Sequence, residues 1–253
     1  MRGLNKIALI VEYDGRHYHG FQWQANAPTI QCELERAIKK LTGEERRVVT
    51  ASRTDAETHA KGQVASFWVK STLPQEVFVK ALNYYLPTDI AVKSAHKISN
   101  DFDVRRDAIS REYEYYILNR PVRSPLTEGF AYFVARELNV SAMNKACHVL
   151  QGEHDFTSFV TSLIGIKSTV RNFYEAKAEK RKDLIVFRFV ANSFLPHQIR
   201  NTVGLLIRVG LGKIDITGFQ QILEAKKPGL AGPTVPAYGL YLTKINYPKP
   251  FPN

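Results

Sequence analysis

Apolar and polar residues alternate along the first hundred residues in a pattern that predicts four strands and two helices. Residues 6–13 form a mostly apolar run, which is typical of a strand covered on both faces. Apolar side chains recur at helical spacing in residues 29–42 and 74–86, and a helix-stopping residue follows each run, Gly43 or Pro87. Further strands are expected at residues 46–51, 63–70 and 90–96.

The second half of the chain repeats this order of elements with larger insertions. The predicted elements are a strand at 111–117, helices at 140–150 and 196–210, a hairpin over 173–190 that turns at 180–183, a short helix around 219–223 and a last strand at 240–247. Strand, helix, strand, strand, helix, strand is the order of the ferredoxin-like split βαβ unit.

We therefore expect an α+β fold with two ferredoxin-like, RRM-like halves, residues 1–104 and 105–253. Their antiparallel sheets are expected to adjoin around a central basic cleft. RNA-recognition modules lay bases on such a sheet, although many unrelated functions share the architecture.

The polar loop between the second and third predicted strands carries one suggestive carboxylate. Asp55 lies two residues after Arg53 and four before His59, so nearby cations would lower its pKa and keep it ionised. A carboxylate nucleophile or base would be arranged in this way. Spacing alone leaves open a solvated turn in which Asp55 only caps backbone amides.

A second loop, residues 14–28, interleaves five rings and Arg16 with glycines. So many rings would be costly to leave in solvent. The loop is therefore expected either to fold against the core or to stack on the bases of a ligand, and the pattern does not choose between these alternatives.

The charge of the chain favours a polyanionic partner. Lys and Arg number 35 against 24 Asp and Glu, a net charge of +11, so nucleic acid comes first and an anionic membrane surface second. Cys32 and Cys147 lie far apart in helical patterns, which indicates buried free thiols in a reducing compartment. Arg208 interrupts the longest apolar stretch, so no membrane span and a cytoplasmic location are expected.

Several common enzyme sites are excluded by their missing motifs. The sequence has no zinc-deaminase pattern, no P-loop and no Gly-x-Ser-x-Gly elbow. Tyr113 follows Arg111 on a predicted strand, where it could also be a core ring. His197 and Arg200 lie at a helix start, where Arg200 could hold a phosphate or a carboxylate, or simply be solvated.

Together these motifs resemble one family, the tRNA pseudouridine synthases of the TruA type. Asp-Gly-Arg-His-Tyr-His-Gly-Phe-Gln-Trp-Gln at residues 14–24 is similar to its early signature, and Arg-Thr-Asp-Ala at residues 53–56 with His59 is similar to its catalytic loop. Further similar stretches lie at residues 29–31, 82–90, 111–115, 154–159, 192–204 and 236–240. Ordered motifs over nearly the whole chain are more specific than any one of them.

This resemblance implies isomerisation of a uridine in the anticodon arm of tRNA, on the 3′ side of the anticodon, by a homodimer without a metal or other cofactor. Asp55 would attack the ribose or the ring, Tyr113 would stack on the flipped base and help to remove a proton, and Arg200 would pair with Asp55. Arg53 would prop the opened stem and Leu240 would pack below the base. The other predicted RNA contacts are Arg16, His59, Arg111 and His197.

Departures from the family pattern lie near the expected site. The family usually has Gly at Ser52, Gly-Val at Glu57-Thr58, and different residues at Pro196 and Gln198. They put the shape of the loop and the target range in doubt, but not the class of reaction. Two other hypotheses are a non-catalytic RNA-binding protein on the same fold and a basic nucleotide-handling enzyme, which would need a metal or phosphate motif.

Overall fold

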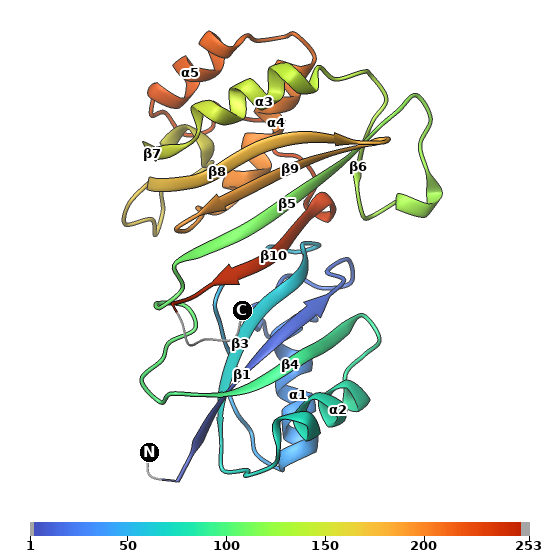
Figure 1. Cartoon of the computed structure of the whole chain (residues 1–253), viewed down its shortest axis with the longest axis vertical. Coiled ribbons are helices and arrows are strands. Elements are labelled where there is room, and N and C mark those ends of the chain that lie inside the picture. Colours follow the sequence, from blue (N-terminus) through green and yellow to red (C-terminus); the bar gives the residue numbers. More distant parts are fainter. Residues whose placement is uncertain (1–2, 249–253) are drawn as a thin grey trace. The chain divides into compact units, whose positions relative to one another are not determined.

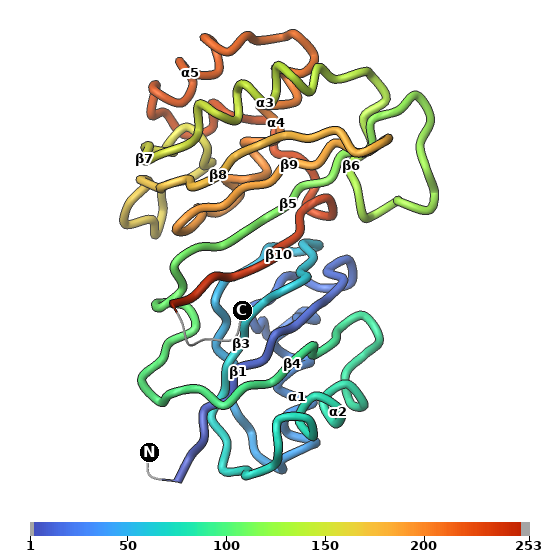
Figure 2. The backbone as a smooth tube through the Cα atoms, in the orientation of Figure 1, coloured from blue at the N-terminus to red at the C-terminus, as the bar shows by residue number. Residues whose placement is uncertain are grey.

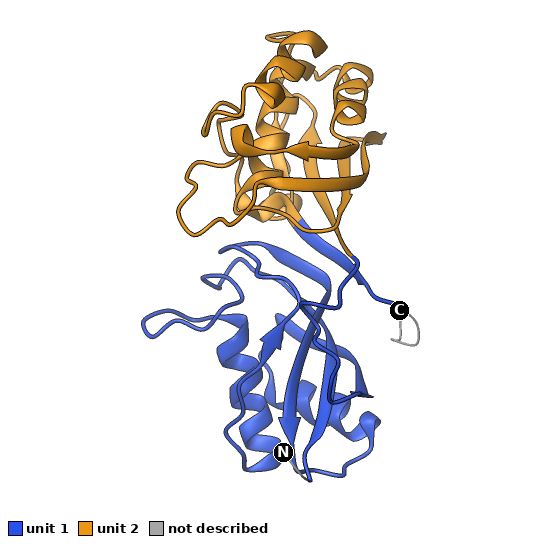
Figure 3. Cartoon of the chain, turned by 90° about the vertical axis from the view of Figure 1, so that its left-hand side faces the viewer, with its two compact units in different colours: residues 1–109, 241–253 blue, residues 110–240 orange. Residues whose placement is uncertain are grey.

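The computed structural model describes residues 3–248, which fall into two compact units (Figure 3). Unit 1 contains residues up to 109 and from 241 onward, and unit 2 contains residues 110–240. The division thus lies five residues after the predicted boundary at 104, and the last strand joins unit 1. The cause is local, because Ile109 N donates to Asn246 O at 2.8 Å and Tyr247 Oη to Val104 O at 2.5 Å.

The sheet of unit 1 has the strand order β4-β1-β3-β10, and β2 also pairs with β3. Its strands are β1 (Asn5–Tyr13), β2 (Val49–Thr50), β3 (His59–Val69), β4 (Ile90–Ile98) and β10 (Leu240–Asn246). β1 is antiparallel to both β3 and β4, with Ile7 opposite Phe67 and Lys97. β10 runs parallel to β3, so this sheet is mixed rather than wholly antiparallel as expected.

Two helices, α1 (Ile30–Thr42) and α2 (Gln75–Tyr85), cover one face of that sheet (Figure 1). The predicted ends of α1 are confirmed. The Thr29 hydroxyl accepts a hydrogen bond from Cys32 N, and Gly43 closes the helix in the left-handed conformation with a φ of 73°. Phe67 of β3 meets Phe78 of α2 edge-on at 6.2 Å, which places the core between helices and sheet.

The sheet of unit 2 has the order β5-β9-β8-β7, with β6 parallel to β5. Its strands are β5 (Ser110–Asn119), β6 (Tyr132–Val134), β7 (Gly152–Asp155), β8 (Val170–Arg181) and β9 (Leu184–Ala191). The predicted hairpin is β8 and β9, joined by a two-residue turn. Residues 120–131 loop away from the sheet between β5 and β6 (Figure 2).

Three helices pack on one face of this second sheet (Figure 1). They are α3 (Val140–Val149), α4 (Gln198–Gly210) and α5 (Ile216–Glu224), and the short 3₁₀ turns are η1 (Pro125–Thr127), η2 (Thr157–Phe159) and η3 (Ala237–Gly239). Beneath them Phe156 stacks on Phe173 at 4.7 Å and meets Phe159 edge-on at 5.5 Å, forming an aromatic core. The expected mixture of helices and strands is therefore present in both units, and no helix of residues 3–248 is long and apolar enough to span a membrane.

Candidate active site

Asp55 lies on the short connection from β2 to β3 in unit 1. Because β2 pairs antiparallel with β3, both ends of this connection are held by one sheet. Asp55 is half-buried, and its carbonyl oxygen accepts a hydrogen bond from Thr58 N at 3.2 Å. Arg53, for which an RNA contact is predicted, is exposed on the same connection. We call residues 51–58 the Asp55 loop.

The loop of residues 14–28 packs against the Asp55 loop through the backbone. Phe21 N donates to Thr54 O at 3.2 Å, and Glu57 N donates to Tyr18 O at 3.2 Å. These two hydrogen bonds hold the Asp55 loop on both sides of Asp55. The carboxylate is therefore carried by a segment tied to the sheet at its ends and to a second loop along its length.

Two glycines allow the two loops to approach this closely. A Cβ atom on Gly20, whose φ is +88°, would lie 2.7 Å from the carbonyl oxygen of Thr54. A Cβ atom on Gly15 would lie 2.1 Å from the carbonyl oxygen of Thr58. Both distances are shorter than carbon–oxygen contact permits, so a larger residue at either position must displace the backbone beside Asp55.

The rings of the 14–28 loop divide between the two alternatives that the sequence leaves open. Tyr18 and Phe21 are buried in unit 1, whereas both histidines of the loop are exposed. Trp23 is 42% exposed, and the guanidinium carbon of Arg47 lies 4.9 Å from its ring centroid. The loop therefore anchors itself in the core with two rings and keeps three in solvent.

A network of buried polar side chains holds the Asp55 loop by hydrogen bonds. The hydroxyls of Tyr13 and Thr54 are 2.8 Å apart, and Gln63 Nε2 donates to Ser52 O at 2.7 Å. Gln63 Nε2 also lies 3.4 Å from Tyr13 Oη, and its Oε1 accepts from Ser52 N at 3.4 Å. Tyr13, Thr54 and Gln63 are all buried, and such a network specifies one loop conformation when its groups are satisfied.

His59 closes the other side of the Asp55 loop. It is 2% exposed and stacks on Tyr241 of β10 with 4.5 Å between ring centroids. Its Nδ1 lies 3.3 Å from Gly15 N and 3.2 Å from Oδ1 of Asp14. Protonation at Nδ1 would exchange the hydrogen bond accepted from Gly15 for one donated to Asp14. This buried side chain packs between the two loops and β10, and the RNA contact expected for it from the sequence stays a prediction.

Asp14 couples this histidine to Arg16, another predicted RNA contact. Arg16 forms an ion pair with Asp14 at 2.6 Å. Burial raises the pKa of Asp14, but hydrogen bonds from Arg16 and the charges of His59 and Arg16 outweigh it and hold this pKa below its ordinary value. The hydrogen bond to Asp14 raises the pKa of Arg16 in turn.

The departures from the family pattern leave local defects in the Asp55 loop. Glu57 is exposed and has a φ of 63°, in the left-handed region that favours glycine. Thr58 is 2% exposed, and its Oγ1 has no hydrogen-bond partner. Glycine at the first position and valine at the second would remove both defects. The third departure, Ser52, makes backbone hydrogen bonds to Gln63 that a glycine could also make.

Unit 2 holds two predicted site residues on β5. Tyr113 lies opposite Phe189 of β9 and meets the ring of Phe194 edge-on at 5.2 Å. Arg111 is buried, and its Nη1 donates to Asn192 O at 2.7 Å. Both side chains are therefore held by the strand β9 and the segment that follows it.

The remaining predicted site residues lie at the start of α4 and the start of β10. Arg200 is half-buried in the first turn of α4, and its Nε donates to Val235 O at 2.8 Å. His197 caps α4 from an exposed position with a φ of 58°. Leu240, the last residue of unit 2, is buried. Unit 1 thus holds Asp55, Arg53, Arg16 and His59, and unit 2 holds Tyr113, Arg111, Arg200, His197 and Leu240.

The supporting residues Tyr13, Thr54 and Gln63 were not identified from the sequence. The sequence holds one signal, because Gln63 begins the apolar, alternating strand predicted at residues 63–70 and a polar residue buried there needs a partner. The partners themselves lie 50 residues away on β1 and 11 residues away on the Asp55 loop. Their meeting depends on strand pairing, which local sequence patterns do not show.

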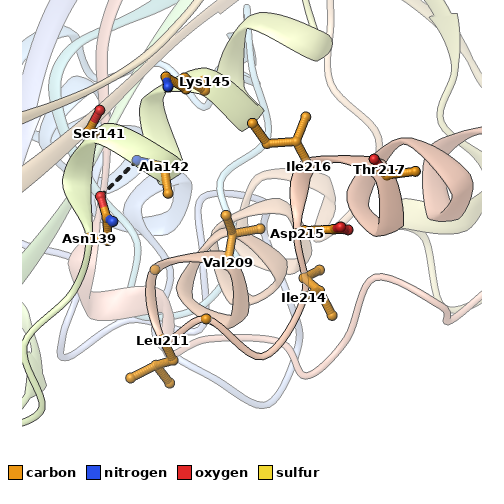
Figure 4. Close-up of a pocket in the computed structure, with 12 residues that line it drawn as sticks. Asn139, Ser141, Ala142, Lys145, Val209, Leu211, Ile214, Asp215, Ile216 and Thr217 are labelled. Carbon is orange, nitrogen blue, oxygen red and sulfur yellow. Dashed lines mark hydrogen bonds between the residues drawn. The ribbon is translucent and has the colours of Figure 1, made fainter.

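A surface hollow of about 700 Å³ in unit 2 lies apart from these residues (Figure 4). It is lined by the start of α3, the end of α4 and the start of α5, where Asn139 Oδ1 accepts from Ala142 N. No predicted site residue lines it. Among residues 3–248 no group of three or more His, Cys, Asp or Glu side chains is placed to hold a metal ion.

Comparison with known proteins matches nearly the whole chain. A family model described as tRNA pseudouridine synthase matches residues 9–107 and 146–248. A tRNA pseudouridine synthase A from Exiguobacterium sp. is 42% identical over 97% of this chain and 99% of its own. One from Thermoanaerobacter sp. is 42% identical over 96% of this chain and 100% of its own. A solved H/ACA RNP bound to a substrate RNA containing 2′-deoxyuridine is 12% identical, with a TM-score of 0.36 over 79% of this chain and 44% of that chain.

Proposed function

Because the chain belongs to the tRNA pseudouridine synthase family, and so is an isomerase that acts on tRNA, we propose that Asp55 is its catalytic carboxylate. The observation that carries this proposal is the way the Asp55 loop is held. Sheet, second loop and buried network fix the backbone on both sides of one half-buried carboxylate. A nucleophile that must reach one atom of a flipped nucleotide needs this kind of fixed position.

The reaction breaks the bond between N1 of uracil and C1′ of ribose and forms one between C5 and C1′. C5 loses a proton and N1 gains one, so no oxidant or reductant is consumed. We propose that Asp55 attacks the ribose or the ring, that Tyr113 stacks on the base and takes part in removing the C5 proton, and that Arg200 keeps Asp55 ionised. The resemblance of residues 53–56, 111–115 and 192–204 to the family motifs supports these roles.

The proposed target is a uridine on the 3′ side of the anticodon in the anticodon arm. We propose that Arg53, Arg16, Arg111 and His197 contact this RNA and that Leu240 packs below the target base. The net charge of +11 supports an extended contact with a polyanion. The working form is proposed to be a homodimer, which light scattering of the purified protein with and without tRNA would test. Its proposed location is the cytoplasm.

The finer architecture is also a proposal, namely that each half is ferredoxin-like, with a basic cleft as the RNA site. In unit 1 the elements run β1, α1, β2, β3, α2, β4, and the sheet order β4-β1-β3 with β2 on β3 supports the assignment. In unit 2 the succession of β5, α3, β8, β9 and α4 supports it, with β6, β7 and α5 as additions.

The deciding experiment incubates purified protein with unmodified tRNA transcripts and maps pseudouridine chemically. Asp55→Asn should abolish product while tRNA affinity stays within about threefold, because binding is spread over many phosphate contacts. Asp101→Asn, an acid-to-amide change at an exposed position, is the matched control and should leave the rate unchanged. Residual turnover of Asp55→Asn within about tenfold of wild type, roughly 1.4 kcal/mol of barrier, would overturn the assignment. Wild-type protein that binds tRNA without forming product would instead identify a non-catalytic RNA-binding protein.

A further inference from the structure

Two loops of unit 2 meet at one end of its sheet, and five basic side chains lie in these loops and in the last two residues of β8. The connection after β5 begins at Arg120, and the turn between β8 and β9 consists of Lys182 and Asp183. Asn119 N donates to Asp183 O at 2.8 Å, which holds the two loops side by side (Figure 1). We call these cations the tip patch: Arg120, Arg123, Lys180, Arg181 and Lys182.

Most of the charge of the tip patch is not neutralised within the protein. Arg120 pairs with Asp183 at 3.3 Å, and Arg181 pairs with Glu179 at 2.9 Å. The other three cations are exposed and form no ion pair within the described part of the chain: Arg123, Lys180 and Lys182. The five cations and the two acids that pair with them sum to a charge of +3, and such an excess of positive charge attracts a polyanion.

The backbone conformation of Lys182 indicates that a lysine at this position does not serve to stabilise the turn. Lys182 has a φ of 57° as the first residue of a two-residue hairpin turn. Such a position favours Asn, Asp or Gly, because a longer side chain costs free energy in the left-handed region. A residue that is kept in an unfavourable conformation at an exposed position suggests a functional contact.

We propose that the tip patch binds phosphates of the tRNA substrate at a distance from the target uridine, an inference that rests on the proposed function. β5 carries Tyr113 near its start and leads into the tip patch at its end. Six residues of strand separate Tyr113 from Asn119, which is about 20 Å at 3.4 Å per residue. A tRNA whose target base lies at Tyr113 therefore presents a different part of its backbone to the tip patch.

Binding measurements with full-length tRNA test this contact. The variant Arg123→Gln, Lys180→Gln, Lys182→Gln should weaken binding about tenfold near 0.1 M salt and lower the slope of log K against log salt by about two to three. The matched control, Lys145→Gln, Lys213→Gln, Lys227→Gln, removes the same charge from exposed positions elsewhere in unit 2 and should change affinity less than about twofold. Equal losses in both variants would show that only net charge matters and would overturn the proposal.

Lys182→Gly separates binding from stability because the two effects have opposite signs. Glycine removes the left-handed conformational cost, so the melting temperature should not fall, while the loss of one phosphate contact lowers tRNA affinity and the salt slope by about one. Unchanged affinity in Lys182→Gly together with unchanged affinity in the triple variant refutes the contact.

Two further readouts distinguish this inference from its premise. If the wild-type protein forms no pseudouridine, the proposed function is refuted. If the wild type is active and the triple variant binds tRNA normally, only the proposed role of the tip patch is refuted. Because the patch acts through binding, the triple variant should keep its kcat at saturating tRNA and lose kcat/KM. Sedimentation with vesicles of an anionic lipid tests the other polyanion, and vesicle binding that depends on the patch while tRNA binding does not would overturn the proposal in favour of a membrane surface.

Discussion

Two threonines of the Asp55 loop should respond to the same substitution with opposite signs. Thr58 is 2% exposed, and its hydroxyl has no partner. Thr54 is also buried, but its hydroxyl lies 2.8 Å from that of Tyr13. Valine replaces a threonine hydroxyl by a methyl group of nearly the same volume. Thr58→Val therefore removes an unsatisfied group, whereas Thr54→Val breaks a hydrogen bond.

The expected magnitudes follow from the cost of a buried polar group. An unpartnered hydroxyl costs about 1–3 kcal/mol, so Thr58→Val should raise the free energy of unfolding by about 1–2 kcal/mol. Thr54→Val should lower it by about 1–2 kcal/mol, because the Tyr13 hydroxyl then loses a partner in a buried site. For a chain of this size each kcal/mol shifts the melting temperature by about 2–4 °C.

Tryptophan fluorescence during urea unfolding isolates the effect. The chain has two tryptophans, Trp23 and Trp68, and both belong to unit 1, which also holds the Asp55 loop. Thr58→Ser keeps the unpartnered hydroxyl and loses the methyl group, so it should not stabilise the protein. If both valine variants shift the midpoint in the same direction, the hydrogen bonding described for the loop is wrong.

Substitutions at three other residues test the same region. Glu57→Gly should stabilise unit 1 by about 0.5–1 kcal/mol by relieving the left-handed conformation, whereas Glu57→Ala should not, and denaturant midpoints compare them. Tyr13→Phe should lower kcat more than it raises KM, because the network with Gln63 positions the loop rather than binding RNA; equal effects on both would refute this positioning role. Folding lowers the pKa of Asp14, so the ionised carboxylate stabilises the folded protein above pH 3.8, and this contribution is lost as the pH falls through the folded pKa. Asp14→Asn should therefore flatten the loss of stability below about pH 4, which thermal unfolding at a series of pH values would measure.

Local patterns in the sequence predicted most elements, because local chemistry decides them. Thr29 and Gly43 limit α1, and the basic run ending at Asp183 marks the hairpin turn. The pairing of β10 with β3 was missed, since the two strands are about 180 residues apart in the chain and their meeting is a long-range event. The two shortest strands of unit 2, β6 and β7, are too short for a period of two to be visible.

The candidate site was recognised through motifs, but its physical support was not. Spacing showed that Asp55 has cations nearby in sequence, and left a solvated turn open. The fold shows why the loop is rigid, since Gly15 and Gly20 let a distant loop pack on it. It also shows that His59, expected to touch RNA, is buried against Tyr241. Residue type alone does not distinguish a histidine that binds a ligand from one that supports a loop.

Violations of local rules gather where function is proposed. Four non-glycine residues of residues 3–248 have a positive φ: Glu57, Lys182, His197 and Lys226. Three buried side-chain atoms there lack a hydrogen-bond partner, on Thr58, Arg171 and Gln198. Glu57 and Thr58 follow Asp55, the proposed catalytic carboxylate, by two and three residues, and His197 and Gln198 begin the helix that carries Arg200. Natural proteins keep such costs mainly at functional sites, because selection there acts on activity rather than on stability.

Two departures from the family pattern, Pro196 and Gln198, lie next to His197, and the structure explains only one of them. Pro196 is exposed, and nothing in the structure explains it. Gln198 is fully buried, and its Oε1 accepts from Leu195 N at 2.8 Å while its Nε2 has no partner. The accepted hydrogen bond fixes the turn just before α4, and this turn sets where α4, the helix that carries Arg200, begins. An apolar residue would remove the unpaired amide but also this hydrogen bond, so at Gln198 the loss of stability and the positioning of Arg200 are two effects of one side chain.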